Sequence, residues 1–309
     1  MFDLIVLDGG AGRELARMGA PFRQPEWSAL ALLEGPDFVT RMHQRYVEAG
    51  ADVITTNSYA VVPFHLGSER FAARGAELAD LAGRLARDAV AGARRPVRVA
   101  GSLPPVCGSY RADLFRPDEA RPILQVLIRG LAPHVDHWLA ETLSAIEEAE
   151  LVREVVDTSV VRPLWLSFTL EDESAVRGQP RLRSGQPVSE AVAAAIRLRA
   201  AAVLFNCSQP EVMEDAVFVA GQVLEDSRAD LRIGVYANAF PPQPKDATAN
   251  DGLSDIRADL TPHNYLAFAK AWHQNGASIL GGCCGIGPEH IDALRRGLTS
   301  VDKDREGRA

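Results

Sequence analysis

Short apolar runs rich in β-branched residues alternate along the chain with longer segments whose apolar residues recur at helical spacing. Such short runs, bounded by turn residues, are typical of buried strands, and apolar positions three or four residues apart are typical of amphipathic helices. The pattern predicts eight strands, at residues 3–8, 52–57, 97–102, 135–142, 163–169, 201–207, 231–238 and 277–282. A helical segment follows each predicted strand, so the chain is organised as repeated strand–helix units.

Two helical segments show what these units look like. Residues 36–50 open with Pro36 and Asp37 and close at Gly50, and residues 68–90 keep the helical pattern over their length. Proline suits the first turn of a helix and glycine suits the residue after the last turn. Eight strand–helix pairs in 309 residues fit a closed (β/α)8 TIM barrel better than an open sheet, and no GxGxxG follows the first strand.

We therefore predict an α/β protein with a single (β/α)8 barrel domain over residues 1–300 and a flexible C-terminal tail at 301–309. Three stretches rich in Pro, Gly and charge, at 103–118, 171–187 and 240–260, are interpreted as long strand-to-helix loops rather than linkers between domains. In a barrel of this kind, these loops gather at the face where the strands end, and reactive groups placed there meet in space.

Composition and charge narrow the class of protein. The chain has 33 Lys and Arg against 41 Asp and Glu, a formal net charge of -8, and no basic cluster, which argues against a nucleic-acid partner. The N-terminus lacks the basic region of a signal peptide, and the apolar stretches are far shorter than the roughly 20 residues that span a bilayer. Four cysteines are too few for a disulfide framework, so we expect a cytoplasmic protein without a membrane partner. The oligomeric state, a homo-oligomer included, stays open.

Three of the four cysteines fall at predicted strand ends. Cys207 ends the sixth strand, and Cys283 and Cys284 follow the eighth within GGCCG. Three thiolates can bind one zinc ion and leave a fourth position for a substrate, as in catalytic zinc sites. The alternatives are that Cys207 is a small buried strand residue, or that the adjacent pair forms a strained disulfide. Cys107 lies in the loop at 103–118 and is interpreted as a bystander.

Two acidic residues share the same predicted face. Asp8 ends the first strand and Glu141 ends the fourth. Each precedes a helical segment, so helix capping is the ordinary interpretation. Together, across the mouth from a metal that binds sulfur, they also suit an ammonium group, which predicts a substrate with a thiol at one end and an amine at the other.

Five segments carry a resemblance to a known family. LDGGAGREL, EAGADVITTNSY, LAET, FNCS and GGCCGIGPEHI resemble, in order and spacing, the homocysteine S-methyltransferase family, whose members are zinc-dependent and cobalamin-independent. The resemblance covers residues 3 to 297 and implies a (β/α)8 barrel. It implies that Cys207, Cys283 and Cys284 are the zinc ligands, and that Asp8 and Glu141 hold the amino group of homocysteine.

The resemblance also assigns three less specific positions. It implies that Asn206 supports the substrate site and that Tyr59 lies near the metal, able to occupy its open position. Trp27 matches an aromatic residue that lines the methyl-donor pocket of betaine-using relatives, although a tryptophan there also suits core packing. This chain departs from many relatives, which have threonine in place of Arg13, and its loop at 103–118 is longer. Both departures flank the side of the predicted site where the methyl donor would bind.

The activity implied is that of an enzyme of class EC 2.1.1 in methionine biosynthesis. It would transfer a methyl group from a sulfonium donor, S-methylmethionine or S-adenosylmethionine, to the zinc-bound thiolate of homocysteine. Three cysteine thiolates leave the zinc centre electron-rich, which keeps the substrate sulfur reactive and favours a cationic donor. The alternatives are a betaine-dependent enzyme, a methyltransferase for another small thiol or a selenol, and a non-catalytic zinc- or thiol-binding barrel.

Overall fold

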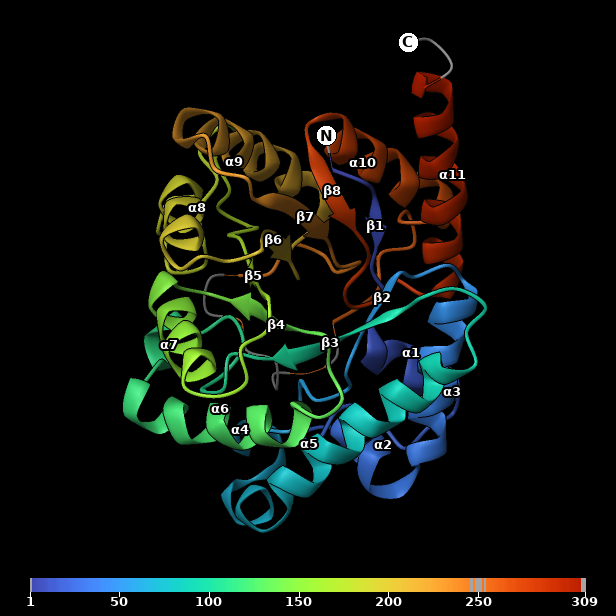
Figure 1. Cartoon of the computed structure of the whole chain (residues 1–309), viewed down its shortest axis with the longest axis vertical. Helices are drawn as coiled ribbons and strands as arrows, with labels where there is room; N and C mark the ends of the chain where they lie inside the picture. Colours follow the sequence, from blue (N-terminus) through green and yellow to red (C-terminus); the bar gives the residue numbers. More distant parts are fainter. Residues whose placement is uncertain (1, 245–246, 248–251, 253, 307–309) are drawn as a thin grey trace.

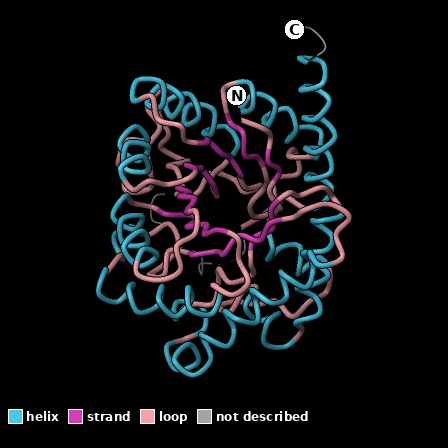
Figure 2. The backbone as a smooth tube through the Cα atoms, in the orientation of Figure 1, coloured by secondary structure: helices cyan, strands magenta, loops and turns pink. Residues whose placement is uncertain are grey.

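Eight parallel strands form a ring at the centre of the molecule, and helices surround it on the outside (Figure 1 and Figure 2). The computed structural model describes residues 2–244, 247, 252 and 254–306. The ring of eight parallel strands surrounded by helices confirms the predicted (β/α)8 barrel. Consecutive strands are neighbours throughout, and β1 pairs with β8 in parallel, with Ile5 opposite Ile279. The remaining seam is joined by a parallel bridge between Leu7 and Val53.

Each of the eight predicted strands is confirmed, with small shifts at the ends. The strands are β1 Ile5–Val6, β2 Val53–Thr55, β3 Arg98–Leu103, β4 His137–Leu143, β5 Leu164–Phe168, β6 Ala202–Asn206, β7 Arg232–Tyr236 and β8 Ala277–Leu280.

The helices lie between and after these strands. They are α1 Ala11–Arg17, α2 Ala29–Glu34, α3 Pro36–Glu48, α4 Pro63–Leu66, α5 Ser68–Ala91, α6 Pro117–Leu131, α7 Ile146–Asp157, α8 Val188–Arg197, α9 Met213–Ser227, α10 Pro262–Gln274 and α11 Pro288–Glu306, with short 3-10 turns at Ala112–Leu114 and Pro210–Val212. The helices predicted at residues 36–50 and 68–90 are α3 and α5. Helix α11 runs to Glu306, and residues 307–309 lie outside the described part, so the flexible tail stays a prediction.

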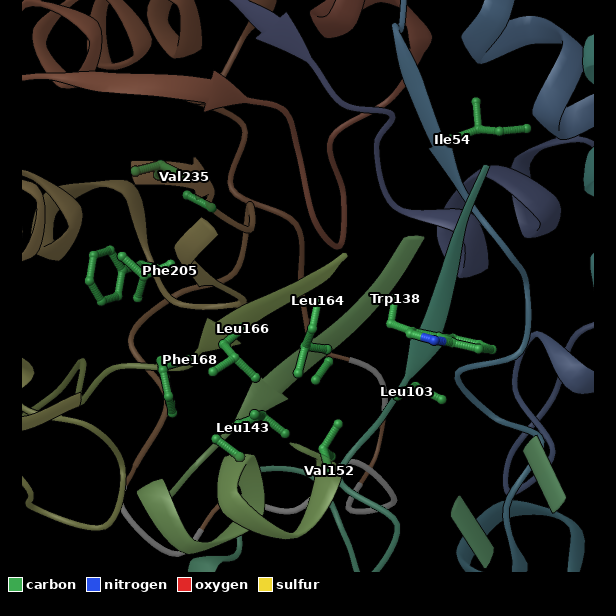
Figure 3. Close-up of a cluster of buried hydrophobic side chains, with 14 of the residues drawn as sticks. Ile54, Leu103, Trp138, Leu143, Val152, Leu164, Leu166, Phe168, Phe205 and Val235 are labelled. Carbon is green, nitrogen blue, oxygen red and sulfur yellow. The ribbon is translucent and has the colours of Figure 1, made fainter. Parts of the chain in front are cut away.

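The side chains of the strands alternate between two apolar clusters. Leu139 of β4 and Leu204 of β6 lie in a small cluster within the ring of strands, whereas their neighbours Trp138 and Phe205 belong to the larger cluster that reaches the helices. This alternation follows from the period of two along a strand, and both clusters are needed because each strand is buried on both faces. Figure 3 shows part of the larger cluster, with labelled side chains that include Trp138, Leu166, Phe168 and Phe205 from the strands and Val152 from α7.

The three predicted loops connect strands to helices. The loop at 103–118 leads from β3 to α6, and the loop at 171–187 leads from β5 to α8 and is tied by bridges from Leu170 to Leu182 and from Arg181 to Pro187. The loop at 240–260 lies between β7 and α10, with residues 245–246, 248–251 and 253 outside the described part. Within the described residues, no helix has the length and apolar character that a membrane crossing requires.

Candidate metal and substrate site

The three predicted cysteines meet where two strands of the barrel end. Cys207 directly follows β6, and Cys283 and Cys284 form a turn shortly after β8. Strands β6 and β8 both pair with β7, which brings their ends close together. As a result, the three sulfur atoms lie within 4.8 Å of one another. Cys107 is not a member of this group.

The glycines of the GGCCG turn allow this close approach. A Cβ atom on Gly282 would collide with the side chain of Ile286, and Gly285 has a φ of +84°, in the left-handed region that favours glycine. On the other side, a Cβ atom on Gly10 would come within 2.5 Å of the carbonyl oxygen of Cys283. The turn is therefore held against the loop after β1 by backbone contacts that larger residues would prevent.

The cysteine group fits a thiophilic metal. Sulfur atoms bound at about 2.3 Å to a tetrahedral zinc ion lie about 3.8 Å apart, so sulfurs within 4.8 Å need only a small adjustment. Hydrogen bonds from the Cys207 and Cys283 thiols lower the pKa of Cys284 well below its ordinary value, whereas hydrogen bonds with Cys207 and Cys284 raise the pKa of Cys283. The group thus already favours one thiolate, which is the form that binds metals.

The two predicted carboxyl groups are buried at the same face. The carboxylate of Asp8 accepts hydrogen bonds from the backbone N–H of Thr55 at 2.7 Å and from its hydroxyl at 3.1 Å. Glu141 accepts one from the Ser102 hydroxyl at 2.5 Å and one from the Tyr236 hydroxyl at 3.4 Å. Burial raises the pKa of Asp8 to about 8 and that of Glu141 to about 7. Each carboxylate would gain from a cation placed beside it, because its charge is costly without one.

Asn206 is fully buried and supports the strand ends. Its Oδ1 accepts hydrogen bonds from the backbone N–H of Thr142 at 2.9 Å and from the Ser167 hydroxyl at 2.8 Å, and its Nδ2 donates to the Thr142 hydroxyl at 2.9 Å. Thr142 has a φ of +60°, an unfavourable value for threonine. Asn206 therefore fixes Thr142, the neighbour of Glu141, and it is absent from the residues that line the cavity. A direct contact with a substrate stays a prediction.

Two tyrosines lie beside the cysteines. The hydroxyl of Tyr59, which the sequence singled out, lies 2.6 Å from the Ser109 hydroxyl. The hydroxyl of Tyr110 lies 2.9 Å from the sulfur of Cys207. Burial raises the pKa of Tyr110 well above its ordinary value, so its phenol is neutral and can donate a hydrogen bond to a thiolate.

Tyr110 is a site residue that the sequence analysis missed. It lies in the long loop at 103–118, and the guanidinium of Arg183 lies 4.9 Å from the centre of its ring. Arg183 is in turn paired with Asp172 at 3.1 Å, and both side chains are almost completely buried. The only signal in the sequence was the unusual length of the loop, which does not indicate which of its residues reaches the cysteines.

The site opens into a cavity of about 190 Å³. The cavity is lined by the three cysteines, both carboxyl groups and Tyr59. It is also lined by Arg13 from α1, Trp27 from the segment before α2 and Phe240 from the loop after β7. Trp27 has a φ of +48° and packs edge-on against Phe22, with 5.7 Å between the ring centroids. It thus packs against a neighbour and also contributes to the cavity wall.

Comparisons with known proteins agree with this geometry. The family described as homocysteine S-methyltransferase matches residues 5–298. A homocysteine S-methyltransferase of Zea mays is 30% identical over 97% of this chain and 90% of its own length. A selenocysteine Se-methyltransferase of Brassica oleracea is 29% identical over 96% of this chain and 89% of its own length.

Solved structures of similar sequence share the fold. The metallated form of the homocysteine methyltransferase MmuM from Escherichia coli is 26% identical, with a TM-score of 0.73 over 96% of both chains. The oxidized form of the same enzyme is 25% identical, with a TM-score of 0.75 over the same shares.

Proposed function

This chain belongs to the homocysteine S-methyltransferase family, and we propose that it transfers a methyl group from a small sulfonium donor to the sulfur of homocysteine, which yields methionine. The observation that carries the proposal is a single cavity lined by three clustered cysteines and two buried carboxyl groups. Such a cavity offers a metal site for the thiol and an anionic site for the amino group of one acceptor molecule.

Zinc is the proposed cofactor, held by Cys207, Cys283 and Cys284. A donor set of three thiolates suits zinc and leaves one position for a further sulfur ligand. Bound there, zinc would supply the charge that keeps the acceptor thiol deprotonated at neutral pH. The hydroxyl of Tyr110 would donate a hydrogen bond to the Cys207 sulfur. Such hydrogen bonds to metal ligands orient the ligands.

Asp8 and Glu141 are the proposed partners of the acceptor's ammonium group. Both line the cavity, and the carboxylate of Asp8 is held by Thr55, while its backbone carbonyl accepts a hydrogen bond from Gly282 of the cysteine turn at 3.0 Å. An ammonium group would stabilise the ionised form of both carboxyls, so binding is expected to lower their raised pKa values. With sulfur and nitrogen both fixed, the acceptor would present its sulfur in one orientation, which is a large part of what accelerates such a transfer.

The methyl donor is proposed to lie against the aromatic wall of the cavity. Trp27, Tyr59 and Phe240 line this part. Aromatic faces attract sulfonium and quaternary ammonium groups through the negative potential of the ring. A sulfonium such as S-methylmethionine or S-adenosylmethionine is the first choice, and betaine is the second.

A selenol acceptor is the second candidate. A relative that is 29% identical over most of both chains is named selenocysteine Se-methyltransferase. Thiols and selenols share the chemistry of a soft nucleophile on a short amino acid, so we propose that selenocysteine be assayed beside homocysteine.

The test combines zinc content with product formation. Reduced protein should contain about one zinc per chain by elemental analysis, and it should form methionine from homocysteine with one of S-methylmethionine, S-adenosylmethionine or betaine. Cys283→Ser should lose both zinc and activity, because two thiolates and a hydroxyl bind zinc more weakly than three thiolates.

Cys107→Ser is the matched control, since Cys107 lies outside the cysteine group and should be replaceable without loss of zinc. Full activity in Cys283→Ser with zinc retained would contradict the metal assignment. Wild-type protein that holds zinc but methylates neither acceptor with any of the three donors would contradict the reaction.

A further inference from the structure

Arg13 lines the same cavity as the three cysteines and the two carboxyl groups. It lies in the first turn of α1, which follows the loop that carries Asp8 (Figure 1). One end of its guanidinium, Nη2, donates a hydrogen bond to the carbonyl oxygen of Ser254 at 2.5 Å, and its Cζ lies 5.8 Å from the centre of the Phe240 ring. These contacts hold the guanidinium at the cavity wall rather than in solvent.

Arg13 has no carboxylate partner in the described part of the chain, although its charge helps to lower the pKa of the Cys284 thiol. Among the described residues that line the cavity it is the only lysine or arginine, whereas the acidic lining residues are Asp8 and Glu141. No described carboxylate lies within 4.0 Å of it, in contrast to Arg183, which is paired with Asp172. Its Nε is buried without a hydrogen-bond partner among the described residues; the Nε atoms of Arg153, Arg162 and Arg183 are in the same state, but of these four arginines Arg13 alone lines the cavity. A buried N–H of a charged group is costly when unpaired, so a donor left in this state beside a cavity indicates an anionic ligand.

The acceptor and the favoured donors carry such an anion. Each is an amino acid whose carboxylate needs a cationic or N–H partner, and Asp8 and Glu141 can serve only the ammonium end. A guanidinium matches a carboxylate through two parallel hydrogen bonds, and the Phe240 ring helps to hold its plane. We propose that Arg13 binds the carboxylate of a substrate and thereby makes the enzyme select carboxylate-bearing substrates. This inference rests on the proposed methyl transfer.

The experiment compares each substrate with its decarboxylated form. The donor pair is S-methylmethionine and (3-aminopropyl)dimethylsulfonium, and the acceptor pair is homocysteine and 3-aminopropane-1-thiol. All four are measured with wild type, Arg13→Gln and Arg13→Lys, and with Arg41→Gln as an exposed control on α3. Arg13→Gln removes the charge and keeps an N–H donor on a shorter side chain, and Arg13→Lys keeps the charge without the guanidinium.

Arg13→Gln should raise KM for the carboxylate-bearing member of one pair by about 10- to 100-fold, the range that the loss of a charge-assisted hydrogen bond produces. KM for the decarboxylated member should change less than about threefold, and Arg13→Lys should recover part of the loss. A response in the donor pair assigns the carboxylate to the donor, and a response in the acceptor pair assigns it to the acceptor. Equal changes within both pairs, or no change, would overturn the inference.

Direct binding separates this inference from the proposed function. Isothermal titration of the same four compounds needs no turnover, so it gives a result even if wild-type protein transfers no methyl group. In that case the proposed reaction fails, whereas Arg13 is still supported if Arg13→Gln weakens binding of a carboxylate-bearing compound alone. If Arg13→Gln and wild type bind all four compounds with equal affinity, the carboxylate assignment is wrong whatever the activity.

Discussion

At the scale of single residues, the contact between the Tyr110 hydroxyl and the Cys207 sulfur leads to a prediction about metal affinity. The neutral phenol can donate a hydrogen bond at 2.9 Å to the sulfur. In other metal sites, removing a hydrogen bond to a metal ligand weakens metal binding by about 10- to 100-fold. We therefore expect Tyr110→Phe to weaken zinc binding by about 10-fold or more, measured by competition with a chelator of known affinity.

Tyr59→Phe provides the matched control for this prediction. The Tyr59 hydroxyl also lies near the cysteines, but its hydrogen-bond partner is Ser109. Its loss should weaken zinc binding less than the loss of the Tyr110 hydroxyl, because no cysteine sulfur loses a hydrogen bond. If both variants weakened zinc binding to the same extent, a general loosening of the site rather than the contact with Cys207 would explain the result.

The same two tyrosines show what sequence reasoning could reach at single positions. Residues directly at strand ends, such as Asp8, Glu141 and Cys207, were predicted because a strand end fixes the face on which a side chain lies. Tyr110 lies in a long loop and has a φ of +68°, so no periodic pattern places it. Asn206 was expected to support the substrate site, and its amide holds Thr142 and Ser167 at the strand ends, while its contact with a substrate stays a prediction. That Asn206 precedes Cys207 in the sequence does not indicate which groups its side chain contacts.

At the scale of elements, the start of helix α7 depends on a buried glutamate. One carboxylate oxygen of Glu148 accepts hydrogen bonds from the backbone N–H groups of Ser144 at 2.6 Å and Ala145 at 3.0 Å. Burial nevertheless raises the pKa of Glu148 from 4.5 to about 7. The folded protein therefore binds a proton that the unfolded chain has released between about pH 4.5 and 7. The contribution of this group to the free energy of unfolding falls as the pH rises through that window.

Glu148→Gln should remove this fall, because glutamine keeps an acceptor oxygen and does not ionise. Relative to wild type, the variant should gain about 2 kcal/mol in the free energy of unfolding between pH 5 and pH 7. Urea unfolding at several pH values measures this difference. Glu147→Gln, an exposed neighbour in the same turn whose charge adds only a minor contribution to the raised pKa of Glu148, should keep most of the wild-type pH dependence. A constant difference between Glu148→Gln and wild type would show that the carboxyl keeps its ordinary pKa.

The elements themselves were largely predictable, and their connections were not. Short apolar runs rich in β-branched residues identified all eight strands, and the helices at 36–50 and 68–90 followed from their apolar spacing, the first also from its proline and glycine boundaries. The loop at 171–187 instead returns on itself through bridges from Leu170 to Leu182 and from Arg181 to Pro187. It also brings Arg183 under Tyr110. The bridges lie within one loop without a periodic pattern, and the contact between Arg183 and Tyr110 joins two loops 73 residues apart, so local patterns encode neither.

At the scale of the whole molecule, closure of the barrel assembles the site. Asp8 follows β1, Glu141 belongs to β4, and the cysteines follow β6 and β8, so these groups meet only when the ring is complete. The seam between β1 and β2 is secured by the Leu7–Val53 bridge and by a hydrogen bond from the Asp8 N–H to the Val53 carbonyl at 3.0 Å. The sequence predicted this meeting because all parallel strands of a barrel end at one face.

A metal bound by these cysteines would join the ends of two strands and stabilise the closed barrel. A ligand that binds only the folded state at 100 times its Kd adds about 2.7 kcal/mol to the free energy of unfolding. With an unfolding entropy of about 2.1 cal/mol/K per residue over 309 residues, this raises Tm by about 4 °C. Calorimetry of wild-type protein with excess zinc and after chelation should show this difference. Cys107→Ser should show it as well, whereas Cys207→Ser should melt at nearly the same temperature with and without zinc. An equal zinc-dependent shift in Cys207→Ser would mean that zinc stabilises the barrel from a site other than the cysteines at the ends of β6 and β8.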